Sequence, residues 1–296
     1  MALGSKNNND DNLRTLLSDV PRRLLTICVG VPILWCLWSI SSTRQLFFQG
    51  TNVAICWEWG VLTKMKSSSR ILFLLLSVAL TNIQDSGPFT IALLFCTALF
   101  PMINSSDRIS PTAILSWTAG FLLIPTPFRA WLDVSQDFHA TVSLLLTVWN
   151  ADTGALFFGR LGSLAQTNLP RPHWLRAVSP SKSVEGLIGG LVGGTLTYWA
   201  LPWFWAFIFG CGLSPVSAMG GRATMLEATT PGRRLALGFV LSLAAIVGDL
   251  WESSLKRAFQ VKDSGKLLPG HGGVLDRFDS SLLAVVVYQQ VLLSKL

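Results

Sequence analysis

Charge is scarce in this chain. Only 13% of its 296 residues are Asp, Glu, Lys or Arg, whereas 50% are hydrophobic and 12 are Trp. A soluble domain of this length carries far more charge on its surface. The composition therefore excludes an ordinary soluble globular protein and favours a protein that lies in a membrane.

Cysteine and histidine are also scarce. The three histidines include His139 and His173, which have no partners at metal-ligand spacing, so we expect no zinc site. We interpret the cysteines as buried apolar side chains, because they form no CxxC pair. They lie in or beside apolar runs, at Cys28, Cys36, Cys56, Cys96 and Cys211.

No dinucleotide-binding fingerprint or internal repeat is present. Gly189, Gly190, Gly193 and Gly194 follow no strand and lack the GxGxxG spacing. They form instead two overlapping pairs of small residues four positions apart. This pattern lets the backbones of two helices approach closely within lipid.

Long apolar runs fill most of the chain and predict an all-α, polytopic transmembrane helix bundle. A span needs about 20 mostly apolar residues, and we expect about nine spans. The run at 71–84 is short, so a re-entrant or interfacial segment stays open there. The runs are 24–40, 46–63, 71–84, 88–103, 109–128, 138–158, 184–209, 235–253 and 281–296.

The polar residues 1–21 are predicted to form a flexible tail, and residues 22–296 a single membrane-embedded domain. The tail has neither the early apolar core of a signal peptide nor the acid-poor composition of a transit peptide. The distribution of Lys and Arg places the N-terminus on the cytoplasmic side. The loop at 210–234 disagrees with this topology, since it carries Arg222, Arg233 and Arg234 on the outer side.

The charge that the chain does have gathers at residues 248–280. Asp249 and Lys256 share one face of the predicted helix, and Asp276 and Asp279 share a face of the next. Carboxylates that converge at one point bind hard cations such as Mg²⁺ together with substrate phosphates. Taken singly, each carboxylate at 276 or 279 is equally typical of a helix N-terminus.

The segment between these helices is rich in glycine. Gly270, Gly272 and Gly273, after Pro269, exclude a helix and let backbone N–H groups converge on a phosphate. His271 lies in the same loop, either as a general base or as a side chain that bonds the backbone.

Two further polar groups lie upstream. Asp152 is placed inside an apolar run, where a carboxylate must be paired, hydrated or bound to a cation. Ser183 is positioned to cap the following helix, whose N-terminus favours an anion. Glu58 is either a site residue or a side chain that reaches the interface between Trp57 and Trp59.

These segments resemble the phosphatidate cytidylyltransferase family, also called CDP-diacylglycerol synthases. The resemblance is strong from about Trp149 onward; before it, only hydropathy and the Trp-Glu-Trp at 57–59 match. Ser163 and Ser181 stand where the family often has a basic residue, which puts nucleotide affinity in question. The matching motifs are DTGA at 152–155, GR at 159–160, SP at 179–180 with Lys182, Glu185 and Gly186, SLKR at 254–257, KDSG at 262–265, PGHGG at 269–273 and LDRFD at 275–279.

The resemblance implies a nucleotidyltransferase that joins CTP and phosphatidic acid to give CDP-diacylglycerol and pyrophosphate in phospholipid biosynthesis. It implies Mg²⁺ as the cofactor, with K⁺ as a second cation, and a homodimer in the lipid bilayer; no nucleic acid is expected. The active site is expected on the cytoplasmic or equivalent face, and a bacterial inner membrane, a plastid membrane and another internal membrane all fit.

The resemblance also implies roles for single residues. The expected catalytic residues are Asp249, Asp276, Lys256, Arg257, Lys262, Asp263, His271 and Arg277. Those expected to bind the nucleotide or cofactor are Ser179, Lys182, Ser183, Glu185, Gly270, Gly272, Gly273 and Asp152. The expected metal ligands are Asp249, Asp276 and Asp279.

Two other functions remain open. A CTP-dependent lipid kinase of the polyprenol or phytol type would have a similar membrane bundle, but would transfer the γ-phosphate to a lipid alcohol. A cation-coupled transporter would have buried carboxylates along several spans, whereas here they gather at one edge beside a glycine-rich loop.

Overall fold

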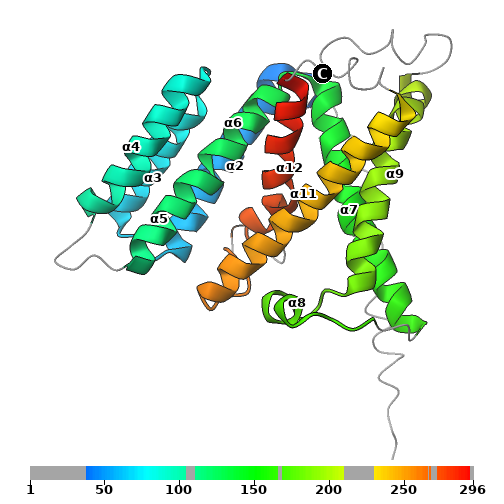
Figure 1. Cartoon of the computed structure of the whole chain (residues 1–296). Coiled ribbons are helices and arrows are strands. Elements are labelled where there is room, and N and C mark those ends of the chain that lie inside the picture. The colour runs from blue at the N-terminus through cyan, green and yellow to red at the C-terminus, as the bar shows by residue number, and fades with distance from the viewer. Residues whose placement is uncertain are drawn as a thin grey trace, which may run out of the picture. The chain divides into compact units, whose positions relative to one another are not determined.

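The computed structural model describes residues 38–104, 111–165, 169–209, 230–265, 267 and 272–293. The regular elements in these ranges are α-helices, which confirms the predicted all-α class (Figure 1). The chain divides into two units, residues 1–44 and 45–296. Of the first unit only residues 38–44 are described, and they include the start of α2. The helices are α2 (Ser41–Leu62), α3 (Ser67–Thr81), α4 (Ser86–Asn104), α5 (Pro111–Leu123), α6 (Pro125–Val134), α7 (Phe138–Leu164), α8 (His173–Val178), α9 (Val184–Phe209), α11 (Pro231–Ala258) and α12 (Leu275–Leu293).

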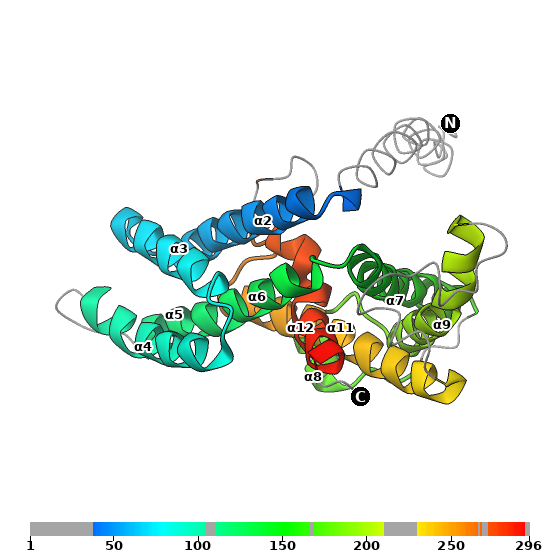
Figure 2. The ribbon, with the colours of Figure 1, turned by 90° about the horizontal axis from the view of Figure 1, so that it is seen from above.

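Four helices of the second unit form a tightly packed group. The most extensive packing joins α7 to α9, and α11 packs against both α9 and α12. Figure 2 shows α12 between α6 on one side and α7 on the other, and both of these helices contact it. The helices α7 and α9, from the middle of the chain, therefore meet α11 and α12.

Small residues allow the close contact between α7 and α9. A Cβ added at Gly154 would lie 2.5 Å from the carbonyl oxygen of Gly189, and one at Gly193 would lie 2.7 Å from that of Asn150. Both distances are shorter than van der Waals contact, so only glycine fits. The close approach predicted from the spacing of small residues in the run 184–209 is confirmed.

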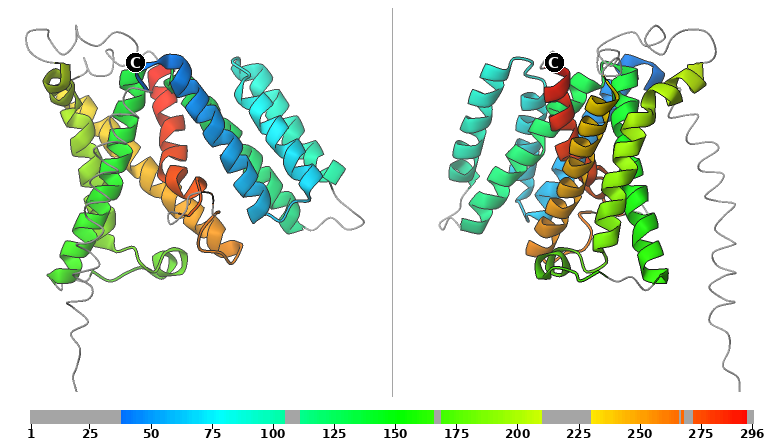
Figure 3. Two further views of the ribbon diagram at one scale, coloured as in Figure 1. Left: turned by 180° about the vertical axis from the view of Figure 1, so that it is seen from behind. Right: turned by 45° about the vertical axis from the view of Figure 1, so that its right-hand side comes forward.

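The remaining helices pack through aromatic rings. Phe73 of α3 and Phe121 of α5 have ring centroids 4.7 Å apart, and Phe100 of α4 lies 5.2 Å from Phe121. Figure 3 shows α2 passing beside α12. There the ring of Phe48 stacks on Trp131 of α6 at 4.4 Å and meets Phe278 of α12 at 6.3 Å.

Several helix boundaries differ from the apolar runs; α7, for example, continues to Leu164, beyond the run at 138–158. The run at 109–128 was expected to be one span, but it divides into α5 and α6 at Ile124, because Pro125 and Pro127 lack the N–H groups that would continue α5. The connection at 160–182 contains the short helix α8, which its Pro-rich sequence did not suggest.

Within the described ranges, α7 and α11 are long and apolar enough to cross a membrane, while α3 and the 86–102 part of α4 are apolar but shorter. Large apolar side chains of α4, among them Ile91, Leu94 and Phe95, are exposed. Most of the expected span at 24–40 and most of the loop at 210–234 lie outside the described residues.

The glycine contact between α7 and α9 leads to a matched test. Gly154→Ala forces the two backbones apart and is expected to destabilise the fold by about 1–3 kcal/mol. Gly50→Ala, in the second unit's part of α2, meets nothing within 4 Å and should leave stability equal or higher, since Ala is the better helix former. Thermal denaturation of the purified protein in detergent measures both. Equal melting temperatures for the two variants would contradict the contact.

Candidate functional site

A cavity of about 550 Å³ lies where α7, α9, α11 and α12 meet, beside the segment that precedes α9. We call it the polar cavity. Its charged lining, among the residues described, consists of four carboxylates and three cations, and several serines complete it. The charged residues are Asp152, Asp249, Asp276, Asp279, Arg160, Arg171 and Lys182; the serines are Ser163, Ser181, Ser183 and Ser280.

The carboxylates come from three helices. Asp152 lies on α7, Asp249 on α11 and Asp279 on α12. The Ser280 hydroxyl lies between two of them, with its Oγ 3.1 Å from Oδ1 of Asp152 and 3.3 Å from Oδ1 of Asp279. Like charges in a partly buried site repel one another unless cations lie between them. The arrangement is therefore suited to binding a cation.

The cations reach the polar cavity mainly from the connection between α7 and α9. Lys182 pairs with Asp249 across 67 positions of sequence. Arg171 donates from Nη1 to the carbonyl oxygen of Pro180 at 3.1 Å, which ties the two ends of this connection together. Ser183 accepts a hydrogen bond from the backbone N–H of Gly186 at 3.1 Å and so caps α9, as its position in the sequence predicts.

Asp276 is held by several donors in the first turn of α12. Its carboxylate accepts from the backbone N–H groups of Gly273 (2.8 Å) and Ser264 (3.0 and 3.1 Å) and from Lys256 Nζ (2.8 Å). Burial alone would raise the pKa of this carboxyl. The bonds from Lys256, Gly273 and Ser264 outweigh burial and hold the pKa of Asp276 below its ordinary value.

Lys256 connects Asp276 to a second buried carboxylate. It forms ion pairs with Asp276 and, one turn back on its own helix, with Glu252. Glu252 is only 5% exposed and was not among the site residues expected from the sequence. Its i, i+4 spacing to Lys256 was the available signal.

The other expected residues take different places. Ser179 is buried, and Glu185 accepts from the backbone N–H of Leu169 at 2.6 Å. Arg257, Lys262, Asp263 and Arg277 are exposed, and Arg257 bonds the carbonyl oxygen of Val261. Gly272 and Gly273 lie against Asp276. Gly270 and His271 lie outside the described residues.

Three lining residues were missed by reasoning from the sequence. Arg160 was named there only within the GR motif, and Arg171 and Ser280 were not singled out as site residues. The signal for Arg160 was its place in the GR motif, two turns of helix after Asp152 on α7. Arg171 carried no local signal, because it reaches the polar cavity only through the folded path of the segment between α7 and α9.

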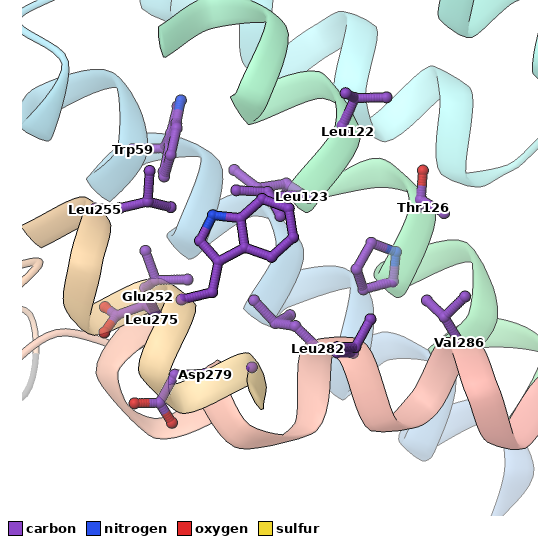
Figure 4. Close-up of a pocket in the computed structure, with 15 residues that line it drawn as sticks. Trp59, Leu122, Leu123, Thr126, Glu252, Leu255, Leu275, Asp279, Leu282 and Val286 are labelled. Atoms are coloured by element: carbon purple, nitrogen blue, oxygen red, sulfur yellow. The ribbon is translucent and has the colours of Figure 1, made fainter. Parts of the chain in front are cut away.

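An apolar cavity of about 230 Å³ lies on the other side of α12 (Figure 4). Its walls come from α2, α5, α6, α11 and α12. Asp279 lines both cavities, so the two spaces adjoin at the first turns of α12. The side chains around it include Trp59, Leu122, Leu123, Leu255, Leu282 and Val286.

The donor set of the polar cavity fits a magnesium ion. No three Asp, Glu, His or Cys side chains in the described ranges are grouped closely enough to hold a metal by themselves. Mg²⁺, however, commonly takes one or two carboxylates and completes its shell with phosphate oxygens and water. Asp249 and Asp279 provide such oxygens beside a space large enough for phosphates, whereas the oxygens of Asp276 already accept several hydrogen bonds.

Comparisons with known proteins show the family of the chain. The chain is 31% identical to a phosphatidate cytidylyltransferase of Brucella suis biovar 1 (strain 1330) over 283 residues, which are 92% of each chain, and equally similar to one of Brucella melitensis biotype 1. One of Staphylococcus saprophyticus is 35% identical over 151 residues, 51% of this chain and 48% of that one. The model of the cytidylyltransferase family matches residues 21–294. The chain therefore belongs to the cytidylyltransferase family.

Proposed function

We propose that this protein is a phosphatidate cytidylyltransferase. It transfers the cytidylyl group of CTP to phosphatidic acid, giving CDP-diacylglycerol and pyrophosphate in phospholipid biosynthesis. The similarity to the Brucella enzymes over 92% of both chains supports this activity. The observation that carries the proposal is the polar cavity, because it brings four carboxylates and three cations from separate motifs to one place.

The cations of the polar cavity suit the phosphates of CTP. Lys182, Arg160 and Arg171 neutralise phosphate oxygens, and the first turn of α9 lines the same cavity and adds the positive end of its helix dipole. We propose that Ser179, Ser183 and Glu185 contribute to nucleotide binding by shaping the segment that carries Lys182. None of the described residues Arg257, Lys262, Asp263 and Arg277 lines the polar cavity. Together with Gly270 and His271, they remain proposed site residues on the strength of their sequence motifs.

Asp249, Asp276 and Asp279 are the proposed metal ligands, with Asp152 beside them. Bound Mg²⁺ supplies positive charge to the triphosphate and to the leaving pyrophosphate. The geometry favours Asp249 and Asp279 for direct contact, since Asp276 is engaged by Lys256 and two backbone N–H groups. K⁺ is proposed as a second cation for the same carboxylate group.

The reaction needs no dedicated base. A phosphomonoester is largely a dianion at neutral pH, because its second pKa is about 6. A phosphate oxygen of phosphatidic acid forms a bond to the α-phosphorus of CTP, the bond between that phosphorus and the bridging oxygen breaks, and pyrophosphate leaves with the electron pair. Residues of the polar cavity orient the two phosphates in line and balance their charge.

The apolar cavity supports a lipid as the second substrate. It adjoins the polar cavity at Asp279, so a molecule with an anionic head and an apolar tail can place one part in each space. We infer that part of the diacylglycerol moiety lies among Trp59, Leu282 and Val286. A soluble phosphate acceptor would leave this cavity without a role.

The wider arrangement is also proposed. Residues 22–296 form one multi-pass membrane domain of about nine spans, preceded by a flexible tail at 1–21, with the N-terminus and the polar cavity on the cytoplasmic or equivalent face. The length and apolar character of α7 and α11 support spanning helices. We propose that two copies form a homodimer in the membrane.

Product analysis tests the reaction. The protein purified in mixed micelles with CTP, Mg²⁺ and phosphatidic acid is expected to release one pyrophosphate for each CDP-diacylglycerol formed. A lipid kinase would instead release CDP and would accept a lipid alcohol in place of phosphatidic acid. Release of CDP, or no turnover with phosphatidic acid, would overturn the proposal.

Replacement of the carboxylates tests the metal ligands. Asp249→Asn and Asp276→Asn remove charge from the polar cavity and are expected to lower turnover by about 100- to 1,000-fold. Asp85→Asn is the control, because Asp85 is exposed between α3 and α4; its turnover should match that of the wild type. Near-normal turnover of both cavity variants, in protein that purifies as the wild type does, would remove these residues from the metal site.

A further inference from the structure

Glu58 is a buried carboxylate that reaches from α2 to the segment between α11 and α12. Its side chain is only 2% exposed. Its oxygens accept from the backbone N–H groups of Val274 and Leu275, each at 2.9 Å, and from the hydroxyl of Ser264 at 3.4 Å. These partners lie 206 to 217 positions further along the chain.

The bonds have a clear physical reason at the start of α12. The first N–H groups of a helix have no partners within the helix, and the helix dipole favours a negative charge there. A local residue usually satisfies these groups. Here Glu58 of another helix does so, which fixes the position of the N-terminus of α12 relative to α2.

Two glycines show how closely the chain wraps around this carboxylate. A Cβ at Gly265 would lie 2.4 Å from Oε1 of Glu58, and one at Gly273 would lie 2.7 Å from Oε2. Neither position admits a side chain while Glu58 is in place. The glycines and Glu58 thus form one unit, which we call the Glu58 clamp.

The Glu58 clamp shares its residues with the bonds to Asp276. Ser264 donates its hydroxyl to Glu58 and its backbone N–H to Asp276, and Gly273, which packs against Glu58, donates its N–H to Asp276 at 2.8 Å. Gly272, where an added Cβ would lie 2.9 Å from Oδ2 of Asp276, has a φ of +83°, a conformation that side chains disfavour. A shift of Glu58 would therefore move the donors that hold Asp276.

We propose that Glu58 is a positioning residue for the reaction. It does not line the polar cavity, and it acts by holding residues 262–265 and 272–276 so that Asp276 and the first turn of α12 face that cavity. This inference rests on the proposed cytidylyltransferase site. It gives the front half of the chain a part in supporting the polar cavity, whose lining residues all follow position 150.

Glu58→Gln is the main test. The amide keeps the size of the side chain but loses the charge, and its NH₂ group faces N–H donors that need an acceptor. Loss of a residue that orients a site in this way typically costs 10- to 100-fold, so kcat/KM for CTP is expected to fall by about that factor. Glu58→Asp, which keeps the charge, should recover part of the loss.

Hydrogen–deuterium exchange provides a readout that does not depend on activity. Peptides that cover residues 262–276 should exchange faster in Glu58→Gln than in the wild type, while peptides from α7 should be unchanged. The matched control is Asp133→Asn, a half-buried carboxylate of α6 that accepts from Gln289 near the other end of α12 at 3.3 Å. It should alter neither the kinetics nor exchange at 262–276.

A second variant covers the case in which Glu58→Gln does not fold. Gly265→Ala retains the glutamate at position 58 but displaces its carboxylate, and it should reproduce the loss of kcat/KM. The control is Gly232→Ala, because a Cβ at Gly232 meets nothing within 4 Å. Wild-type kinetics for the clamp variants, or faster exchange throughout the protein with unchanged kinetics, would overturn the inference. A wild-type enzyme without activity on CTP and phosphatidic acid would overturn the proposed function instead. In that case, faster exchange of the Glu58→Gln variant, limited to peptides that cover 262–276, would still support the Glu58 clamp.

Discussion

The repulsion among carboxylates is the constraint on which the polar cavity depends. Asp152, Asp249 and Asp279 face one space in a chain with few charges, and such a group is stable only if cations and N–H donors lie close to it. Lys182 supplies one cation to Asp249, and Lys256 supplies another to Asp276. The remaining negative charge is what a divalent cation would balance.

The packing of glycine against backbone places these charges. Gly154 touches Gly189 across the contact of α7 and α9, and it lies two residues after Asp152. The same contact continues to Gly159 and Gly186, where Ser183 caps α9 just after Lys182. Because the two backbones are in contact, the carboxylate on α7 and the cation before α9 are held at a fixed separation. A helix pair separated by larger side chains would allow them to drift apart.

Local patterns in the sequence predicted the helices and the acidic residues of the site. The all-α class follows from apolar composition, and the spacing of Asp276 and Asp279 placed both on the first turns of one helix. The break at Ile124 was missed because an apolar run hides the effect of Pro125 when only hydropathy is read. Arg171 was missed for another reason: its role arises from contacts made by the folded chain, which no local pattern encodes.

Glu58 illustrates the same limit and also explains part of the family resemblance. Before Trp149 that resemblance rests on hydropathy and on the Trp-Glu-Trp at 57–59. In the structure Trp57 is exposed, Trp59 is buried with its indole N–H directed to the Ser116 carbonyl at 3.3 Å, and Glu58 points inward to α12. The interpretation in which Glu58 reaches the interface between the two rings is therefore wrong. In this chain a carboxylate of the front half supplies the acceptors for the backbone N–H groups of Val274 and Leu275 at the start of α12.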